Sequence, residues 1–303
     1  MSCRRLYATP LQAILILAAS HAYAGGPISP DSDIVGLRTT MTPDQIKQLI
    51  RQQFSTTDFP TKTLKFGISE YSRDVGLGFS GDITSAQDKA ANQTRMDAQR
   101  KAAVAMGCNS PLCMPLANGL IKDTIDVYVN PTEGSSGVLA LVRQTEYPQT
   151  AKMLETVFLQ SLTEKYGRQT WDDNFTNFYW TDGAMNQNQV MECGRFADNI
   201  GDLQRQFPQV MNGFANSPMT AYGKNKTKPP LCSMYLHVNI GWTTGAMGTS
   251  DYNTKYIQKF TMALVNVRAS YNALSAYAAE FWSVADKAHQ DKLSIQSQNK
   301  PKL

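Results

Sequence analysis

The sequence predicts an α+β fold in which helices pack on antiparallel sheets. Tyr147 to Gly167 places apolar residues at steps of three and four, as an amphipathic helix does, and β-rich runs flank it on both sides. Leu231 to Trp242 alternates between apolar and polar residues, which is typical of a strand with one buried face. Arg268 to Leu293 returns to the helical period and closes the fold as an amphipathic helix.

Residues 1–24 have the three parts of a signal peptide. Arg4 and Arg5 form a positive region, Leu11 to Ala19 form a short apolar run, and the triplet ending at Ala24 is an A-x-A cleavage site. The apolar run is too short to cross a bilayer, and no later segment is apolar enough to do so. We therefore expect a periplasmic or secreted protein with no integral membrane segment after cleavage.

The first helix of the mature chain has the clearest start. Thr42 is the expected N-cap, Pro43 takes the first helical position, and Gln45 completes a capping box. Ile46 and Ile50 then belong to the apolar stripe that should face the core. The sequence therefore predicts a helix up to about Phe54.

A glycine-rich stretch follows at Gly76 to Gly81 and matches the G-x-G-x-x-G pattern of dinucleotide-binding loops. That pattern requires a buried strand before it, and Tyr71 to Val75 does not have the composition of one. We therefore expect a flexible glycine loop here. A helix with a weak apolar face should follow from Ser85 to Met106 and end at Gly107.

The order of the elements suggests two modules. Ile121 to Val129 and Val138 to Arg143 predict a hairpin that completes an N-terminal α+β module, residues 25–146. Residues 147–303 form the expected C-terminal module, which ends in an amphipathic helix. Each module opens with a helix and continues into strands, so two tandem copies of one unit are an alternative, although the halves share no residue-level identity.

Within the C-terminal module, Phe175 to Thr181 predicts an aromatic strand. Met191 to Phe207 has the spacing of a short helix, and Ala215 to Pro230 has the composition of an exposed loop. On the strand after that loop, His237 is expected on the outer face. Lys255 to Val267 predicts the last strand.

Four of the five cysteines follow the signal segment: Cys108, Cys113, Cys193 and Cys232. An even number of cysteines in an exported chain predicts two disulfides, for which three connectivities exist. We favour Cys108–Cys113 and Cys193–Cys232, because each pair then lies within one half of the chain. A redox pair at Cys108 and Cys113 is the alternative, but their spacing is not C-x-x-C.

Neither the net charge nor the spacing of residues indicates a nucleic-acid, metal, cofactor or serine hydrolase site. Without Arg4 and Arg5 the net charge falls from +4 to +2, which predicts no nucleic-acid partner. His237 and His289 have no neighbours at metal-ligand spacing, and no G-x-S-x-G motif exists, so we expect no metal, no cofactor and no serine hydrolase.

One enzymatic alternative rests on Trp171 to Asp182. Asp172, Asp173 and Asp182 lie near two tryptophans there and could supply the acid pair of an envelope polysaccharide hydrolase. For the aromatic residues of this segment, we favour a cross-strand cluster over a sugar-binding role.

Three stretches resemble exported Gram-negative proteins of uncharacterised function: DIVGLRTTMTPDQIKQLI, VRQTEYPQTAKMLETVFLQSLTEKYG and PLCSMYLHVNI. The first also resembles the opening helix of the BamE and β-lactamase-inhibitor-like modules. That resemblance implies small α+β units that act by binding other proteins. The chain lacks the lipoprotein cysteine of BamE, so an outer-membrane anchor is not expected. We therefore expect a non-enzymatic protein that binds another protein or an envelope component.

Overall fold

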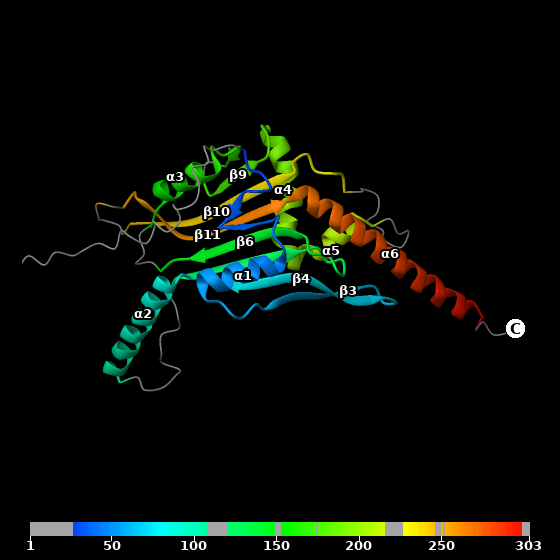
Figure 1. Cartoon of the computed structure of the whole chain (residues 1–303), viewed down its shortest axis with the longest axis horizontal. Coiled ribbons are helices and arrows are strands. Elements are labelled where there is room, and N and C mark those ends of the chain that lie inside the picture. Colours follow the sequence, from blue (N-terminus) through cyan, green and yellow to red (C-terminus); the bar gives the residue numbers. More distant parts are fainter. Residues whose placement is uncertain are drawn as a thin grey trace, which may run out of the picture.

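A nine-stranded antiparallel sheet forms the centre of the computed structural model, which describes residues 27–107, 120–148, 153–173, 175–215, 227–245, 250 and 252–298 (Figure 1). Within these residues the strand order is β3-β4-β5-β6-β11-β10-β9-β8, and β7 pairs with β11 beside this path. The strands are β3 Thr61–Gly67, β4 Ser72–Asp82, β5 Lys122–Val129, β6 Val138–Glu146, β7 Met153–Leu154, β8 Trp171–Asp172, β9 Asn177–Thr181, β10 Met234–Thr244 and β11 Lys255–Asn266. A separate small pair consists of β1 Asp33–Ile34 and β2 Leu37–Arg38.

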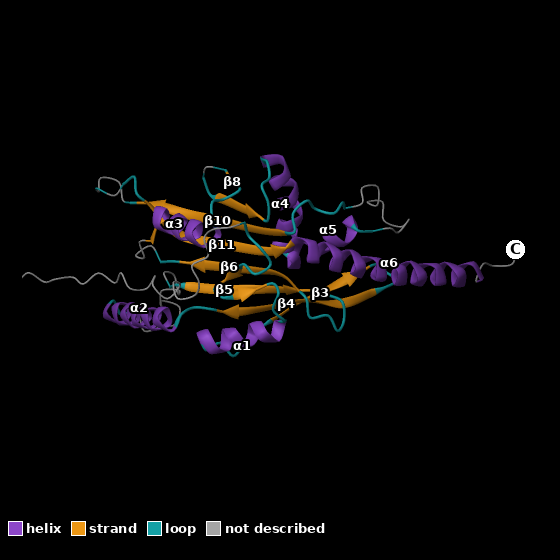
Figure 2. Cartoon of the chain, turned by 45° about the horizontal axis from the view of Figure 1, so that its top comes forward, coloured by secondary structure: helices purple, strands orange, loops and turns teal. Residues whose placement is uncertain are grey.

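Helices cover both faces of the sheet, which confirms the predicted α+β class (Figure 2). The helices are α1 Pro43–Phe54, α2 Ala86–Ala105, α3 Glu155–Tyr166, α4 Gln187–Gly201, α5 Leu203–Gly213 and α6 Val267–Gln298. One apolar cluster lies between the sheet and α1 and α3, with Ile46 and Leu162 among its members. A second cluster lies between the opposite face and α4, α5 and α6, and includes Phe207 and Phe281.

The two halves of the chain meet where β6 pairs with β11. Seven residue pairs join these strands, from Lys259 with Glu146 to Val265 with Ala140. Each half runs through a helix, two strands, a helical segment and two further strands, and the last strand of each half lies at the junction. The strand order is therefore symmetrical about the junction. The expected division at residues 146 and 147 therefore falls at the centre of a continuous sheet, and the two-module organisation stays a prediction.

Local sequence signals account for the helix starts. Thr42 caps α1, with its hydroxyl accepting from the Gln45 amide at 3.3 Å and the Gln45 side chain accepting from the Thr42 amide at 2.8 Å. Asn186 and Gln189 repeat this capping box at the start of α4. The capping-box prediction for α1 is thus confirmed.

The expectation of a flexible glycine loop at Gly76 to Gly81 is wrong, because this stretch lies within β4. Gly78 has a φ of 142°, and a Cβ atom there would lie 1.8 Å from the Val127 carbonyl oxygen. The glycine is needed because β5 approaches the backbone closely at an irregularity in the sheet.

Helix boundaries also differ from the predictions. The described part of the Tyr147–Gly167 segment becomes helical only at Glu155, after the two-residue strand β7. Met191 to Phe207 belongs to two helices, α4 and α5, that meet at Asp202. The last helix extends to Gln298, beyond the apolar stripe, and this end is exposed.

Cys193 of α4 and Cys232, two residues before β10, are paired in the structure. Their Cα atoms lie 6.1 Å apart, and both residues are buried. The pair ties α4 to the start of β10 across a segment that includes undescribed residues. Cys108 and Cys113 lie outside the described residues.

Replacing Thr42 by Ala should lower the free energy of unfolding by about 1 kcal/mol, because the first-turn amides lose their side-chain acceptor. Urea unfolding of the two proteins measures the difference. Thr63→Ala, on an exposed position of β3, is the matched control. An equal midpoint for Thr42→Ala and the wild type would contradict the capping role.

Replacing Cys193 and Cys232 together by Ala should lower the free energy of unfolding by about 4 kcal/mol, because the unfolded chain regains the freedom of a long loop. Urea unfolding without reductant measures it. Reductant added to this variant then isolates the effect of Cys108 and Cys113. A double variant as stable as the oxidised wild type would show that this crosslink does not stabilise the fold.

Candidate functional site

One end of the sheet face beneath α4, α5 and α6 is not covered by these helices. Along β11 the side chains on this face change from buried Val265 and Ala263 to half-buried Thr261 and exposed Lys259. In Figures 1 and 2 the three helices lie toward the opposite end of the strands. The sheet therefore presents a polar area to solvent at this end.

Five neighbouring strands each contribute one uncharged polar side chain to a line across this area. The line follows the strand register from β5 through β6, β11 and β10 to β9. Its members are Thr124, Gln144, Thr261, Asn239 and Asn177. We call these five residues the hydroxyl–amide row. At about 4.8 Å between strands, it is about 19 Å long.

A second line, the charged row, lies next to it toward the strand ends. Lys122 pairs in register with Glu146, and Glu146 with Lys259. All three side chains are exposed, and among the described residues none forms an ion pair. The Lys259 stem lies over Gly241, where a Cβ atom would be only 2.8 Å from it. The two rows together are called the open face.

The sequence of α2 explains why this area stays uncovered. α4 and α5 connect β9 to β10 and pack on the sheet, whereas α2 connects the corresponding strands β4 and β5 but extends away from it (Figures 1 and 2). α2 has no continuous apolar stripe and buries only Ala103. A helix of this kind gains little by packing on a sheet.

Stacked rings lie beside the Asn239 and Asn177 part of the hydroxyl–amide row, one register position toward the helices. Tyr179 lies between Trp171 and His237, with ring centroids 5.1 Å and 4.6 Å away. His237 Nε2 lies 2.9 Å from Asn177 Oδ1, and His237 Nδ1 lies 3.2 Å from an Asp198 oxygen on α4. His237 is therefore half-buried between the sheet and α4, rather than on an open outer face as expected.

Asp173 fixes the position of Asn177. Its carboxylate accepts hydrogen bonds from the amides of Phe175, Thr176 and Asn177 and, at 2.6 Å, from Asn177 Nδ2. Partial burial alone would raise the pKa of Asp173, but these four donors lower that pKa to about 2. The Asn177 carbonyl oxygen is thereby turned toward His237 and toward Asn239, whose amide nitrogen lies 2.8 Å away.

At the β4 side, the acidic groups beside the open face are already neutralised. Asp82 lies 3.2 Å from Lys89, and Asp126 lies 3.2 Å from Lys62. Burial raises the pKa of Asp82, but hydrogen bonds from Thr84 and the charge of Lys89 lower it overall. A hollow of about 420 Å³ adjoins this margin, lined by Ser55, Thr56, Thr57, Asp58, Pro60, Ser80, Gly81, Asp82, Lys89 and Thr124.

The carboxylates of the hydrolase alternative have structural partners. Asp173 is saturated within its own turn, and both oxygens of Asp182 accept from the Ser233 amide at 3.0 Å. Asp172 accepts from Gln169 Nε2 at 3.1 Å. A glycosidase acid needs a raised pKa, which is the opposite of the shift at Asp173.

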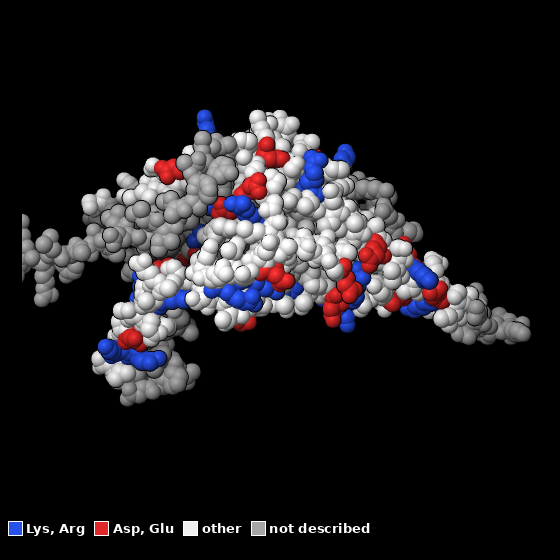
Figure 3. Space-filling view, in the orientation of Figure 1, with Lys and Arg blue, Asp and Glu red and all other residues white. Residues whose placement is uncertain are grey.

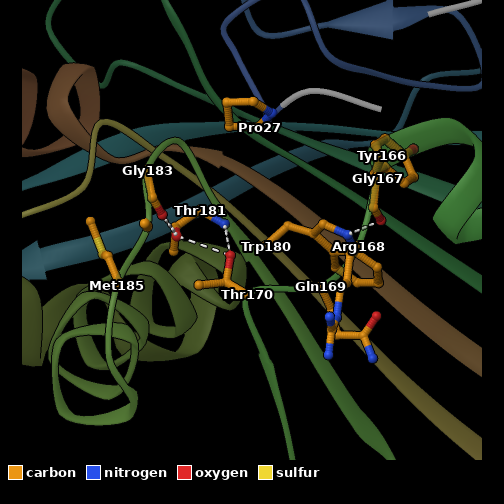
Figure 4. A pocket seen from close by; sticks show the side chains of 11 residues that line it. Pro27, Tyr166, Gly167, Arg168, Gln169, Thr170, Trp180, Thr181, Gly183 and Met185 are labelled. Carbon is orange, nitrogen blue, oxygen red and sulfur yellow. Dashed lines mark hydrogen bonds between the residues drawn. The ribbon is translucent and has the colours of Figure 1, made fainter. Parts of the chain in front are cut away.

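A second hollow, of about 390 Å³, lies between the segment after α3 and the end of β9 (Figure 4). Its polar groups largely bind one another: Thr181 bridges Thr170 and the Gly183 carbonyl, and the Trp180 indole donates to the Gly167 carbonyl.

Within the described residues, no group of three His, Cys, Asp or Glu side chains is arranged to hold a metal ion. No helix among them is long and apolar enough to cross a membrane. Positive and negative side chains are interspersed on the face seen in Figure 3. No family model, curated protein or solved structure matches this chain.

Sequence reasoning did not find the open face. The available signal was the change from apolar to polar residues at alternate positions near the ends of β6 and β11, at Gln144, Glu146, Lys259 and Thr261. Such a change is also typical of a frayed strand end. Only the pairing of the strands shows that these residues form continuous rows.

Asp173→Asn should lower the free energy of unfolding at pH 7, because an amide nitrogen at that position cannot accept from Asn177 Nδ2. The folded-state pKa lies below the usual 3.8, so this stabilisation is present above about pH 4 and is lost as the pH falls toward 2. Urea unfolding of both proteins at pH 7 and pH 2.5 measures it. A difference that is as large at pH 2.5 as at pH 7 would contradict this account.

Proposed function

We propose that this chain is a non-enzymatic periplasmic or secreted protein that binds another protein or an envelope component through the open face. The observation that carries the proposal is the row of uncharged polar side chains on five adjacent strands, left uncovered where helices cover the rest of that sheet face. Thr124, Gln144 and Thr261 have no side-chain hydrogen-bond partner among the described residues. Their donors and acceptors are available to a ligand.

Other features support export and binding rather than catalysis. The buried Cys193–Cys232 pair fits an oxidising compartment, as does the signal-like sequence of residues 1–24. The resemblance of the first helix to BamE and β-lactamase-inhibitor-like modules also favours binding. The carboxylates between Trp171 and Asp182 hold backbone and side-chain groups of the protein, so no observation on them favours the hydrolase.

Photo-crosslinking tests the proposal. Benzoylphenylalanine in place of Gln144, on the open face, should give adducts with envelope material from the producing cells, because it reacts with C–H bonds of any bound molecule. The same replacement of Gln52, exposed on α1, is the matched control and should give none. Adducts from position 52 but not from position 144 would exclude the open face as the binding surface.

A further inference from the structure

We propose that the ligand of the open face is a linear, uncharged polysaccharide carrying hydroxyl and acetamido groups. This inference rests on the proposed function and names the class of its ligand. Thr124, Gln144 and Thr261 and the amide oxygen of Asn239 offer hydrogen-bonding groups on four adjacent strands, whereas Asn177 is bonded to Asp173, His237 and Asn239. These four positions extend over about 14 Å, which suits an extended polymer that lies across the strands.

The chemistry of the row matches such a polymer. The hydroxyls of Thr124 and Thr261 both donate and accept, and the amide of Gln144 does so at two separate atoms. Sugar hydroxyls and acetamido groups have the same dual character. The row itself carries no charge, and the nearest acidic groups on the β4 side, Asp82 and Asp126, are paired with lysines. An uncharged ligand therefore meets no unpaired charge in this row.

The end of α4 and a stack of aromatic rings flank the hydroxyl–amide row. On the covered side of the row, the end of α4 packs against β11. A Cβ atom placed on Gly201 of α4 would lie 3.4 Å from the Ala263 methyl. The stack of Trp171, Tyr179 and His237 lies beside Asn177 and Asn239, one register position toward the helices, and Trp171 on the edge strand β8 is only half-buried. A half-buried aromatic ring beside a polar row suits the apolar face of a sugar ring.

A protein partner is disfavoured by what the open face lacks. Binding energy in protein interfaces concentrates in aromatic and other apolar anchors at the centre, where charged residues are depleted. None of the eight residues of the two rows is aromatic or aliphatic, and three of them are charged. An extended peptide could not add to the sheet here either, because the backbone groups of these strands are already paired within it.

Cosedimentation tests the inference, using the mature chain with chitin, an uncharged polymer of acetamido sugars, and separately with purified peptidoglycan sacculi, whose glycan strands carry the same groups but also bear charged peptides. The wild type should pellet with both polymers. In Gln144→Ala/Thr261→Ala, two hydrogen-bonding side chains are lost, so the dissociation constant should rise about tenfold or more. Gln52→Ala/Thr63→Ala removes the same residue types from exposed positions on α1 and β3 and should bind like the wild type. Circular dichroism of each variant checks that it folds.

Salt dependence separates neutral recognition from charge attraction. Binding by the hydroxyl–amide row should change little between 50 mM and 500 mM salt, whereas binding through Lys122 and Lys259 alone should weaken strongly.

Three outcomes would overturn the inference: no pelleting of the wild type with chitin, an equal loss in the control variant, or loss of binding at high salt. Protein adducts at position 144 without polysaccharide binding would overturn it while leaving the proposed function intact. Absence of both would reject the two together.

Discussion

The antiparallel pairing of β6 with β11 is the interaction on which the rest of the structure depends. It is the contact that turns two four-stranded halves into one sheet, and it places Gln144 beside Thr261 and Glu146 beside Lys259. Both rows of the open face cross this junction. Without it, each half would expose a long edge strand, and neither row would exist.

A buried ion pair fixes the register beside that junction. Arg143 donates to both oxygens of Asp123, at 2.9 and 2.6 Å, and Thr145 donates to the same carboxylate at 2.9 Å. These three residues lie on the opposite face of β5 and β6 from the hydroxyl–amide row. A slip of one residue would bury Gln144 and expose Arg143. The ion pair and hydrogen bonds among Arg143, Asp123 and Thr145, on the sheet face opposite the hydroxyl–amide row, therefore also determine which residues form the open face.

The two halves use the same order of elements but cover the sheet unequally. In the C-terminal half, α4 buries Val190, Cys193, Ala197 and Ile200 on one side, so it packs on the sheet. α2 has the corresponding place in the chain but has no continuous apolar stripe, and it extends away from the sheet after contacting its margin through Lys89. The open face thus results from a helix that does not pack over it, combined with polar residues at the strand ends.

The sequence by itself determined the α+β class, the capped start of α1, the strands around Val238 and Ile257, and the pairing of Cys193 with Cys232, because each depends on residues close in sequence or on a small set of alternatives. It could not show that Gly76 to Gly81 lies in a strand, since the reason is the close approach of Val127. It could not assemble the open face either. Thr124 and Asn177 become members of one row only through four successive strand pairings, and long-range register is set by packing that no single stretch of sequence contains.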